Sequence, residues 1–325
     1  MSAEPPRDGV LRRVLANTGV LLGGRAVNAV LSLGYMALAA RSLGIGAFGV
    51  LVLINTFAQF VSDVAKFQAW QTILHFGAAP LAEGRRADFQ QVVRFGVVLD
   101  LISVAFGVCA GAAGAWLLGP SLGLPEAARG QAAVYALSVA VLAPTAQVGL
   151  LRLFDRFGLL AAQGAISSAV RLVGGGLGMA IEAPLVFFLA VWALGSLAAF
   201  AYVAAAAALE MRRRGLWTSF SWSGPLTAGL PKAWRFAWAT NASSSVDVAF
   251  THVATLSVGA LAGAADAGLW RVARQIADAL AKPARLLIPA LYPELAKLHA
   301  AGRAGAMGRR ARRRAAWRVP DRGPG

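Results

Sequence analysis

The chain has 325 residues, of which 58% are hydrophobic and only 14% are charged, and its mean hydropathy is +0.61. Soluble domains have about 45–50% apolar and about 25% charged residues, so this composition excludes an ordinary soluble protein and predicts a membrane protein. The formal net charge is +16. Because Lys and Arg cluster in short segments between apolar runs, the charge indicates membrane topology and argues against nucleic-acid binding.

Eight apolar runs are long enough to cross the hydrocarbon core of a bilayer, which takes about 20 residues of helix. Lipid offers no partner to backbone N–H and C=O groups, so each run is predicted to be a helix. The predicted fold class is therefore all-α, a polytopic membrane helical bundle. The runs span roughly residues 15–40, 47–68, 95–118, 131–153, 158–181, 184–208, 235–261 and 276–296.

The orientation of the bundle follows from the basic residues between the runs. Most Lys and Arg residues lie before the first run and after each even-numbered run, whereas the remaining connections hold few. Cytoplasmic connections are enriched in Lys and Arg. Both termini are therefore predicted to be cytoplasmic, in an N-in, C-in arrangement.

The longest inner connection pairs a basic cluster with aromatic residues, among them Trp217, Phe220 and Trp222. Aromatic side chains beside cations are typical of a segment at the headgroup level, although a solvated linker would also fit. This connection is the predicted domain boundary. The predicted domains are a first six-helix lobe (1–209), a cytoplasmic connection (210–234), the first two helices of an incomplete second lobe (235–300) and a basic tail (301–325).

A short repeat crosses that boundary. The segment 43–50, LGIGAFGV, has a counterpart in 262–269, AGAADAGL, at a shift of 219 residues. Each segment stands at a predicted outer turn between two helices, with glycines where a positive φ or a close backbone approach is needed. The pattern favours two related helix bundles, as in transporters built from parallel repeats.

Some charged residues fall close to the predicted middle of the membrane. Arg25, with Asn28 one turn later, interrupts the first run, and Arg171 and Asp247 lie at a similar depth in later runs. A centred Arg or Asp costs about 2.5–3.5 kcal/mol on insertion scales, so such residues face a bundle interior or a wet cavity. We expect them to line a cavity; a structural ion pair of Arg25 or Arg171 with Asp247 is the alternative.

The last predicted helix carries charges at intervals of three or four residues, which places them on one stripe. Asp278 can balance Arg274 or Lys282 and leaves the stripe net positive. A positive stripe next to water predicts an anionic substrate, and Asp247 and Asp278 are candidates for coupling an ion or balancing charge. The stripe consists of Arg271, Arg274, Asp278, Lys282 and Arg285. By contrast, Asp63, Lys66 and Asp100 are interpreted as interfacial anchors.

The sequence predicts no catalytic or metal chemistry and no cofactor. The single cysteine, Cys109, lies inside an apolar run, and the three histidines are scattered. The Gly174–Gly176 stretch lies within an apolar run without a preceding strand, so it predicts close helix packing rather than a phosphate loop.

Three segments resemble the polysaccharide and O-antigen flippases of the MOP exporter superfamily, which are related to lipid II flippases. They are Arg41-Ser42-Leu43-Gly44 with Phe48-Gly49, then Phe67-Gln68-Ala69-Trp70-Gln71, and finally Ala265–Pro293, which runs on as Glu294-Leu295-Ala296-Lys297. The resemblance covers about residues 12 to 300. It implies a carrier that moves an undecaprenyl-diphosphate-linked oligosaccharide to the outer leaflet.

The resemblance also implies a site. In lipid II flippases a cationic central cavity receives the diphosphate, and two of its arginines are similar in position to Arg25 and Arg274. Asn28, Arg171, Lys282 and Arg285 join them as candidate substrate-binding residues, the last three on their chemistry alone. The expected partners are the anionic lipid-linked oligosaccharide, membrane lipids and other polysaccharide assembly proteins.

The chain departs from the family in length. Family members carry twelve or more helices in two lobes, whereas eight runs are found here, followed by a tail rich in Arg, Gly and Pro. A truncated or frame-altered product is the favoured interpretation, with a tail that binds anionic lipid as the alternative. A membrane-embedded glycan polymerase or ligase and a non-functional fragment of a flippase are the competing functions.

Overall fold

The computed structural model describes residues 7–218 and 220–278, and for residues 7–22, 24–26 and 245–251 it describes the backbone alone. The chain divides into two compact units, Met1–Arg274 and Gln275–Gly325. Of the second unit only residues 275–278 are described, and they are helical. The account that follows therefore concerns the first unit.

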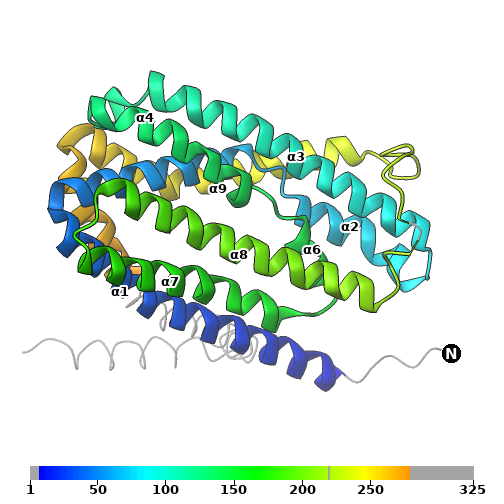
Figure 1. Cartoon of the computed structure of the whole chain (residues 1–325). Coiled ribbons are helices and arrows are strands. Elements are labelled where there is room, and N and C mark those ends of the chain that lie inside the picture. Colours follow the sequence, from blue (N-terminus) through cyan, green and yellow to red (C-terminus); the bar gives the residue numbers. More distant parts are fainter. Residues whose placement is uncertain (1–6, 219, 279–325) are drawn as a thin grey trace, which may run out of the picture. The chain divides into compact units, whose positions relative to one another are not determined.

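The first unit is built from helices. The elements are α1 (Arg7–Ala65), α2 (Ala69–Ala82), α3 (Arg86–Leu117), η1 (Pro120–Leu122), α4 (Glu126–Tyr135), η2 (Ala136–Ser138), α5 (Val139–Leu142), α6 (Ala146–Leu153), α7 (Phe157–Ala180), α8 (Leu185–Arg213) and α9 (Ala233–Ala262). Residues 264–274 are helical as well. Helix α7 packs between α1 and α8 (Figure 1). The described residues contain no strand, so the predicted all-α class is confirmed.

Within the described residues, five helical stretches are long and apolar enough to cross a membrane: Val27–Ala82, Arg86–Leu117, Glu126–Leu153, Phe157–Ala180 and Leu185–Arg213. The first of them joins two predicted spans, because helix α1 continues through the predicted outer turn with one non-helical residue, Gly44. Helix α9 coincides with the seventh predicted span. The eighth, 276–296, lies almost entirely outside the described residues.

The fourth predicted span is helical but interrupted. It consists of α4, η2, α5 and α6, with a break at residues 143–145 that contains Pro144. Proline removes a backbone donor and clashes with the preceding turn, which explains the break. A broken helix is tolerated at membrane depth only where other groups satisfy its backbone, and that requirement places a polar residue nearby, as described below.

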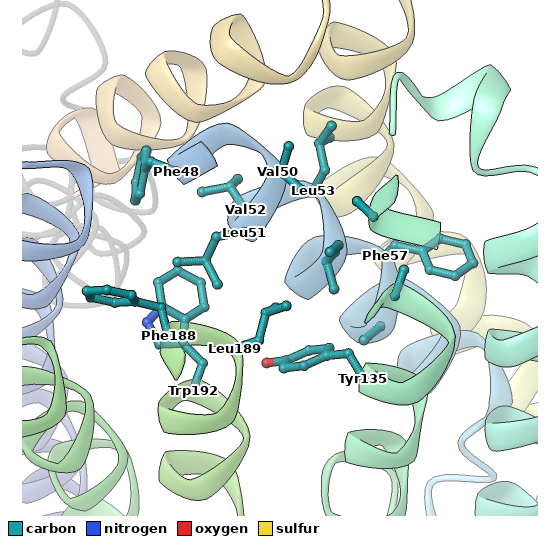
Figure 2. Close-up of a cluster of buried hydrophobic side chains, with 14 of the residues drawn as sticks. Phe48, Val50, Leu51, Val52, Leu53, Phe57, Tyr135, Phe188, Leu189 and Trp192 are labelled. Carbon is teal, nitrogen blue, oxygen red and sulfur yellow. The ribbon is translucent and has the colours of Figure 1, made fainter. Parts of the chain in front are cut away.

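Two apolar clusters hold the unit together. In the first, Leu51 of α1 points towards Phe188, Leu189 and Trp192 of α8, with Tyr135 of α4 alongside (Figure 2). Phe48 and Leu53 of α1 belong to the same cluster, and Leu53 lies against α9. Leu256 of α9 and Ala267 are buried in the same cluster. The helices that follow the connection therefore share a core with those that precede it. The second cluster is formed mainly by α2, α3, α6 and the last turns of α8.

The predicted repeat is visible in the backbone. Gly44 has φ 73° and ψ 168°, and Gly263, which is 219 residues further on, has φ 94° and ψ 174°. Both values of φ lie in the region that L side chains rarely adopt, so glycine is required at each position. Each glycine lies at the junction between two helices, at the same position of the repeated segment. The repeat of the two turns is therefore confirmed. The division into two lobes remains a prediction.

Candidate functional site

Two of the predicted site residues meet along the seam between α1 and α7. The Oδ1 atom of Asn28 on α1 accepts a hydrogen bond from Oγ of Ser168 on α7, at 2.6 Å. One turn later on α7, the Nη1 atom of Arg171 lies 3.4 Å from the hydroxyl of Tyr35 on α1. Glycines bring the helices together: a methyl group on Gly164 would lie 3.2 Å from Cγ of Asn28. The seam is therefore close-packed and polar at once.

Arg171 is enclosed by three helices. Its Nη2 atom donates to the carbonyl of Trp192, at 3.2 Å, and to Oγ of Ser196, at 2.9 Å, both on α8. The guanidinium carbon lies 5.6 Å from the ring centre of Tyr35 and 5.2 Å from that of Trp192. Arg171 is only 8% exposed. Its position is thus fixed by hydrogen bonds and by two aromatic rings that favour a cation.

The charge of Arg171 is not neutralised by any carboxylate among the described residues. Its Nε atom has no hydrogen-bond partner there. A buried cation without a counter-ion is costly, so it is retained where its field or a bound anion is useful. The alternative ion pair of Arg171 with Asp247 stays a prediction, because the Asp247 side chain lies outside the described residues.

The other predicted site residues are less well placed. Arg25 and Asp247 lie in α1 and α9, but their side chains are outside the described residues. Lys282 and Arg285 are wholly outside them. Arg274 is half-buried and interacts with other groups. The same is true of Asp278, which belongs to the second unit. The structure thus brings Asn28 and Arg171 to one seam and does not test whether the remaining cations join them.

Two of the cavities between the described helices are mainly apolar. One, of about 390 Å³, lies between α4 and α8 and includes Gln131, Tyr135 and Leu189 in its wall. The other, of about 360 Å³, is lined by α3, α5, α6 and α8 and is closed at one end by Trp217, Phe220 and Trp222. Neither is lined by a basic residue, so neither is the predicted cationic cavity.

Asp100 was interpreted from sequence as an interfacial anchor, but it satisfies the break in the fourth span. Its carboxylate accepts hydrogen bonds from the backbone N–H of Thr145, at 2.9 and 3.0 Å, and of Ala146, at 2.8 Å. It therefore caps the first turn of α6 from α3. The pairing could be anticipated only in part, because Pro144 indicated a break and nothing in the sequence showed which acidic residue would face it.

Arg94 is one of the basic residues that follow the second predicted run and that were used to predict the topology, but it is buried and holds the connection after α8. Its guanidinium donates to the backbone carbonyls of Ser221, Ser223 and Pro225. Gln90, one turn earlier on α3, donates to the carbonyls of Leu216 and Thr218, each at 2.9 Å. Next to these contacts Phe220 stacks on Trp217 and meets Trp222 edge to face. The described part of the predicted connection is thus folded against α3 and is not a solvated linker.

These features define a polytopic membrane protein with charged and polar groups held between its helices. The family model of polysaccharide biosynthesis proteins matches residues 14–299, and the chain belongs to that family. It is 32% identical over 292 residues to the inner membrane protein YghQ of Escherichia coli strain K12; the match covers 90% of this chain and 82% of that protein. No solved structure matches the chain. The chain is accordingly a multi-pass protein of the bacterial inner membrane.

Proposed function

We propose that this protein is a flippase that moves an undecaprenyl-diphosphate-linked oligosaccharide from the cytoplasmic to the outer leaflet. The observation that carries the proposal is the family match over residues 14–299 on a bundle of membrane-spanning helices. The resemblance to MOP-type flippases, noted from three separate segments, supports the more specific substrate and direction.

The substrate combines a charged diphosphate with a polar glycan, and neither partitions into hydrocarbon. A carrier therefore needs cations that are held inside the bundle and not neutralised by acidic neighbours. Arg171 meets that description among the residues that the structure describes, and its surroundings are polar on the side of Asn28 and Ser168. Arg25 is one turn from Asn28 on α1, and it is proposed with Arg274 to bind the diphosphate directly.

Alternating access would use the two sets of helices on either side of the connection at 210–234. The predicted lobes each contain a helix pair joined at an outer glycine turn, at Gly44 and Gly263. In transporters with parallel repeats, one bundle rocks against the other around a central site. The proposed roles assign binding to the buried cations and movement to the bundles, with no catalytic step.

The experiment is complementation of a strain that lacks the gene, with surface polysaccharide as the readout. Wild type should restore surface glycan, whereas Arg25→Ala and Arg274→Ala should reduce it by at least about tenfold, since each removes a charged contact worth roughly 1.5–3 kcal/mol. Arg212→Ala serves as the matched control, because Arg212 is an exposed basic residue at the end of α8. Equal surface glycan from all variants at equal expression would overturn the assigned roles.

A further inference from the structure

The first helix after the connection, α9, lies against the second half of α1 from the outer turn to the inner end. At the outer end Gly49 meets the backbone of Ala264, and further along Gly259 of α9 packs against Leu53. At the other end the Nδ2 atom of Asn241 on α9 donates to the carbonyls of Val64, at 3.2 Å, and Lys66, at 2.7 Å. The contact is therefore made by small and apolar residues at the outer end and by polar groups at the inner end.

The polar end contains three ionisable side chains in direct contact. The ammonium group of Lys66 pairs with Oδ1 of Asp63, within the last residues of α1 and its exit. The other carboxylate oxygen, Oδ2, lies 3.0 Å from Nε2 of His252 on α9. The Asp63 carboxylate is thus bound by Lys66, at the end of its own helix, and by His252 on α9.

His252 has an open position for a proton. The residue is 6% exposed, and within the described part of the chain its Nδ1 atom has no hydrogen-bond partner. When neutral, the imidazole donates Nε2–H to Asp63 and leaves a lone pair on Nδ1. Proton uptake at Nδ1 turns the ring into imidazolium, so that the hydrogen bond to the ionised Asp63 carboxylate becomes an ion pair.

Every charged group that faces this position from the surrounding described elements can be named. Helix α1 and its exit contribute Asp63 and Lys66, α9 contributes His252, and α3 contributes Asp100, whose carboxylate is acted on electrostatically by Lys66. With both carboxylates ionised and His252 neutral, the group carries one excess negative charge, and one proton balances it. Such closely coupled groups take up a proton as a set.

The set is not fully enclosed by the bundle, because the side chains of Lys66 and Asp63 are 17% and 24% exposed. We propose that Asp63, Lys66 and His252 form a proton-binding site whose occupancy sets the strength of the contact between α1 and α9. The protonated state holds the inner end of the contact more tightly, and loss of the proton weakens it. Its use in transport rests on the proposed function, whereas proton binding itself does not.

The test of proton binding is nuclear magnetic resonance of the full chain in detergent micelles, with ¹⁵N-labelled histidine, between pH 5 and pH 9. Three histidines are present, and His252→Gln assigns the resonance. We expect the ¹⁵N resonances of His252 to change across this range as Nδ1 takes up its proton, and we expect Asp63→Asn to alter that change, since a carboxylate within contact distance favours the charged ring. The signal of His75, which stacks on Phe236 away from this carboxylate, should not follow the substitution.

The test of coupling is the distance between spin labels on Ala242 of α9 and Leu101 of α3, both exposed, in a Cys109→Ser background. The distance distribution should be narrow at pH 5.5 and broader or longer at pH 8.5, and His252→Gln should abolish this dependence. Asn241→Ala, which weakens the same contact without a titrating group, should keep it. Resonances of His252 that do not change with pH, or that change identically in Asp63→Asn, would overturn the site even if the protein transports glycan. Normal titration without transport would contradict the proposed function instead.

Discussion

Gly49 and Gly268, which stand at equivalent places in the two repeated turns, are in contact with each other. A methyl group on Gly268 would lie 3.0 Å from Cα of Gly49, and one on Gly49 would lie 1.9 Å from the carbonyl oxygen of Ala264. The repeat therefore does more than recur along the chain. Its two copies pack against each other, which gives a physical reason for glycine at both positions.

The first prediction concerns this contact. Gly49→Ala should lower the midpoint of thermal unfolding in detergent, because a methyl group has no room beside backbone that cannot rotate away. Overpacking of this kind costs about 1–3 kcal/mol. Gly46→Ala is the matched control, since Gly46 lies in the same turn with nothing within 4 Å of an added methyl group. An unfolding midpoint for Gly49→Ala equal to that of the control would contradict the described packing.

The second prediction separates a structural from a functional role of Arg171. Arg171→Met replaces the buried cation by an apolar chain of similar length, so stability should change by less than about 1.5 kcal/mol. Surface glycan should nevertheless fall by about tenfold or more if the charge serves the substrate. Arg171→Lys keeps a charge but loses the planar fork that reaches Trp192 and Ser196. Full transport by Arg171→Met, measured at equal expression, would assign Arg171 to packing alone.

The third prediction concerns the cap on α6. Asp100→Ala leaves the N–H groups of Thr145 and Ala146 without their acceptor and should destabilise the protein by roughly 1–3 kcal/mol, measured as a lower unfolding midpoint. Asp100→Asn keeps one acceptor oxygen, so its unfolding midpoint should lie between those of wild type and Asp100→Ala. Glu126→Ala is the comparison, because that side chain is 87% exposed and its loss should change little. An Asp100→Ala protein as stable as wild type would rule out the cap.

The fourth prediction concerns the connection after α8. Arg94→Ala removes the donor to three carbonyls of residues 221–225. Limited chymotrypsin digestion should therefore cut after the aromatic residues of the connection faster, by about tenfold for each 1.4 kcal/mol lost. Arg86→Ala, an exposed residue at the start of α3, should leave the rate unchanged. If both variants were cut at the wild-type rate, the connection would not depend on Arg94.

Much of the fold could be predicted because membrane helices can be recognised from the length and hydropathy of apolar runs alone. The first seven predicted runs coincide with helices, and the glycine repeat marks both outer turns. The extent of α3 was underestimated: it begins at Arg86 and not near residue 95, since its first turns are polar on the face that holds the connection. Hydropathy averaged over a window of residues does not detect such polar turns.

The polar contacts were harder to predict, because they join residues far apart in the chain. Arg171 was identified from its depth, but its partners on α1 and α8 depend on helix packing. Asp63, Asp100 and Arg94 were assigned to the interface by their sequence positions, and the structure places them against α9, α6 and the connection. Only the three-dimensional arrangement distinguishes a buried charge from an anchor near a helix end.

The most direct test of the proposed function is transfer of its substrate by the purified protein. Liposomes containing the full chain and a labelled undecaprenyl-diphosphate-linked oligosaccharide would be assayed for label that becomes accessible to a membrane-impermeant reagent. The account predicts transfer by wild type well above that of empty liposomes and a loss of about tenfold or more in Arg25→Ala and Arg274→Ala. Transfer no faster than in empty liposomes, or equal transfer by all three proteins, would contradict it.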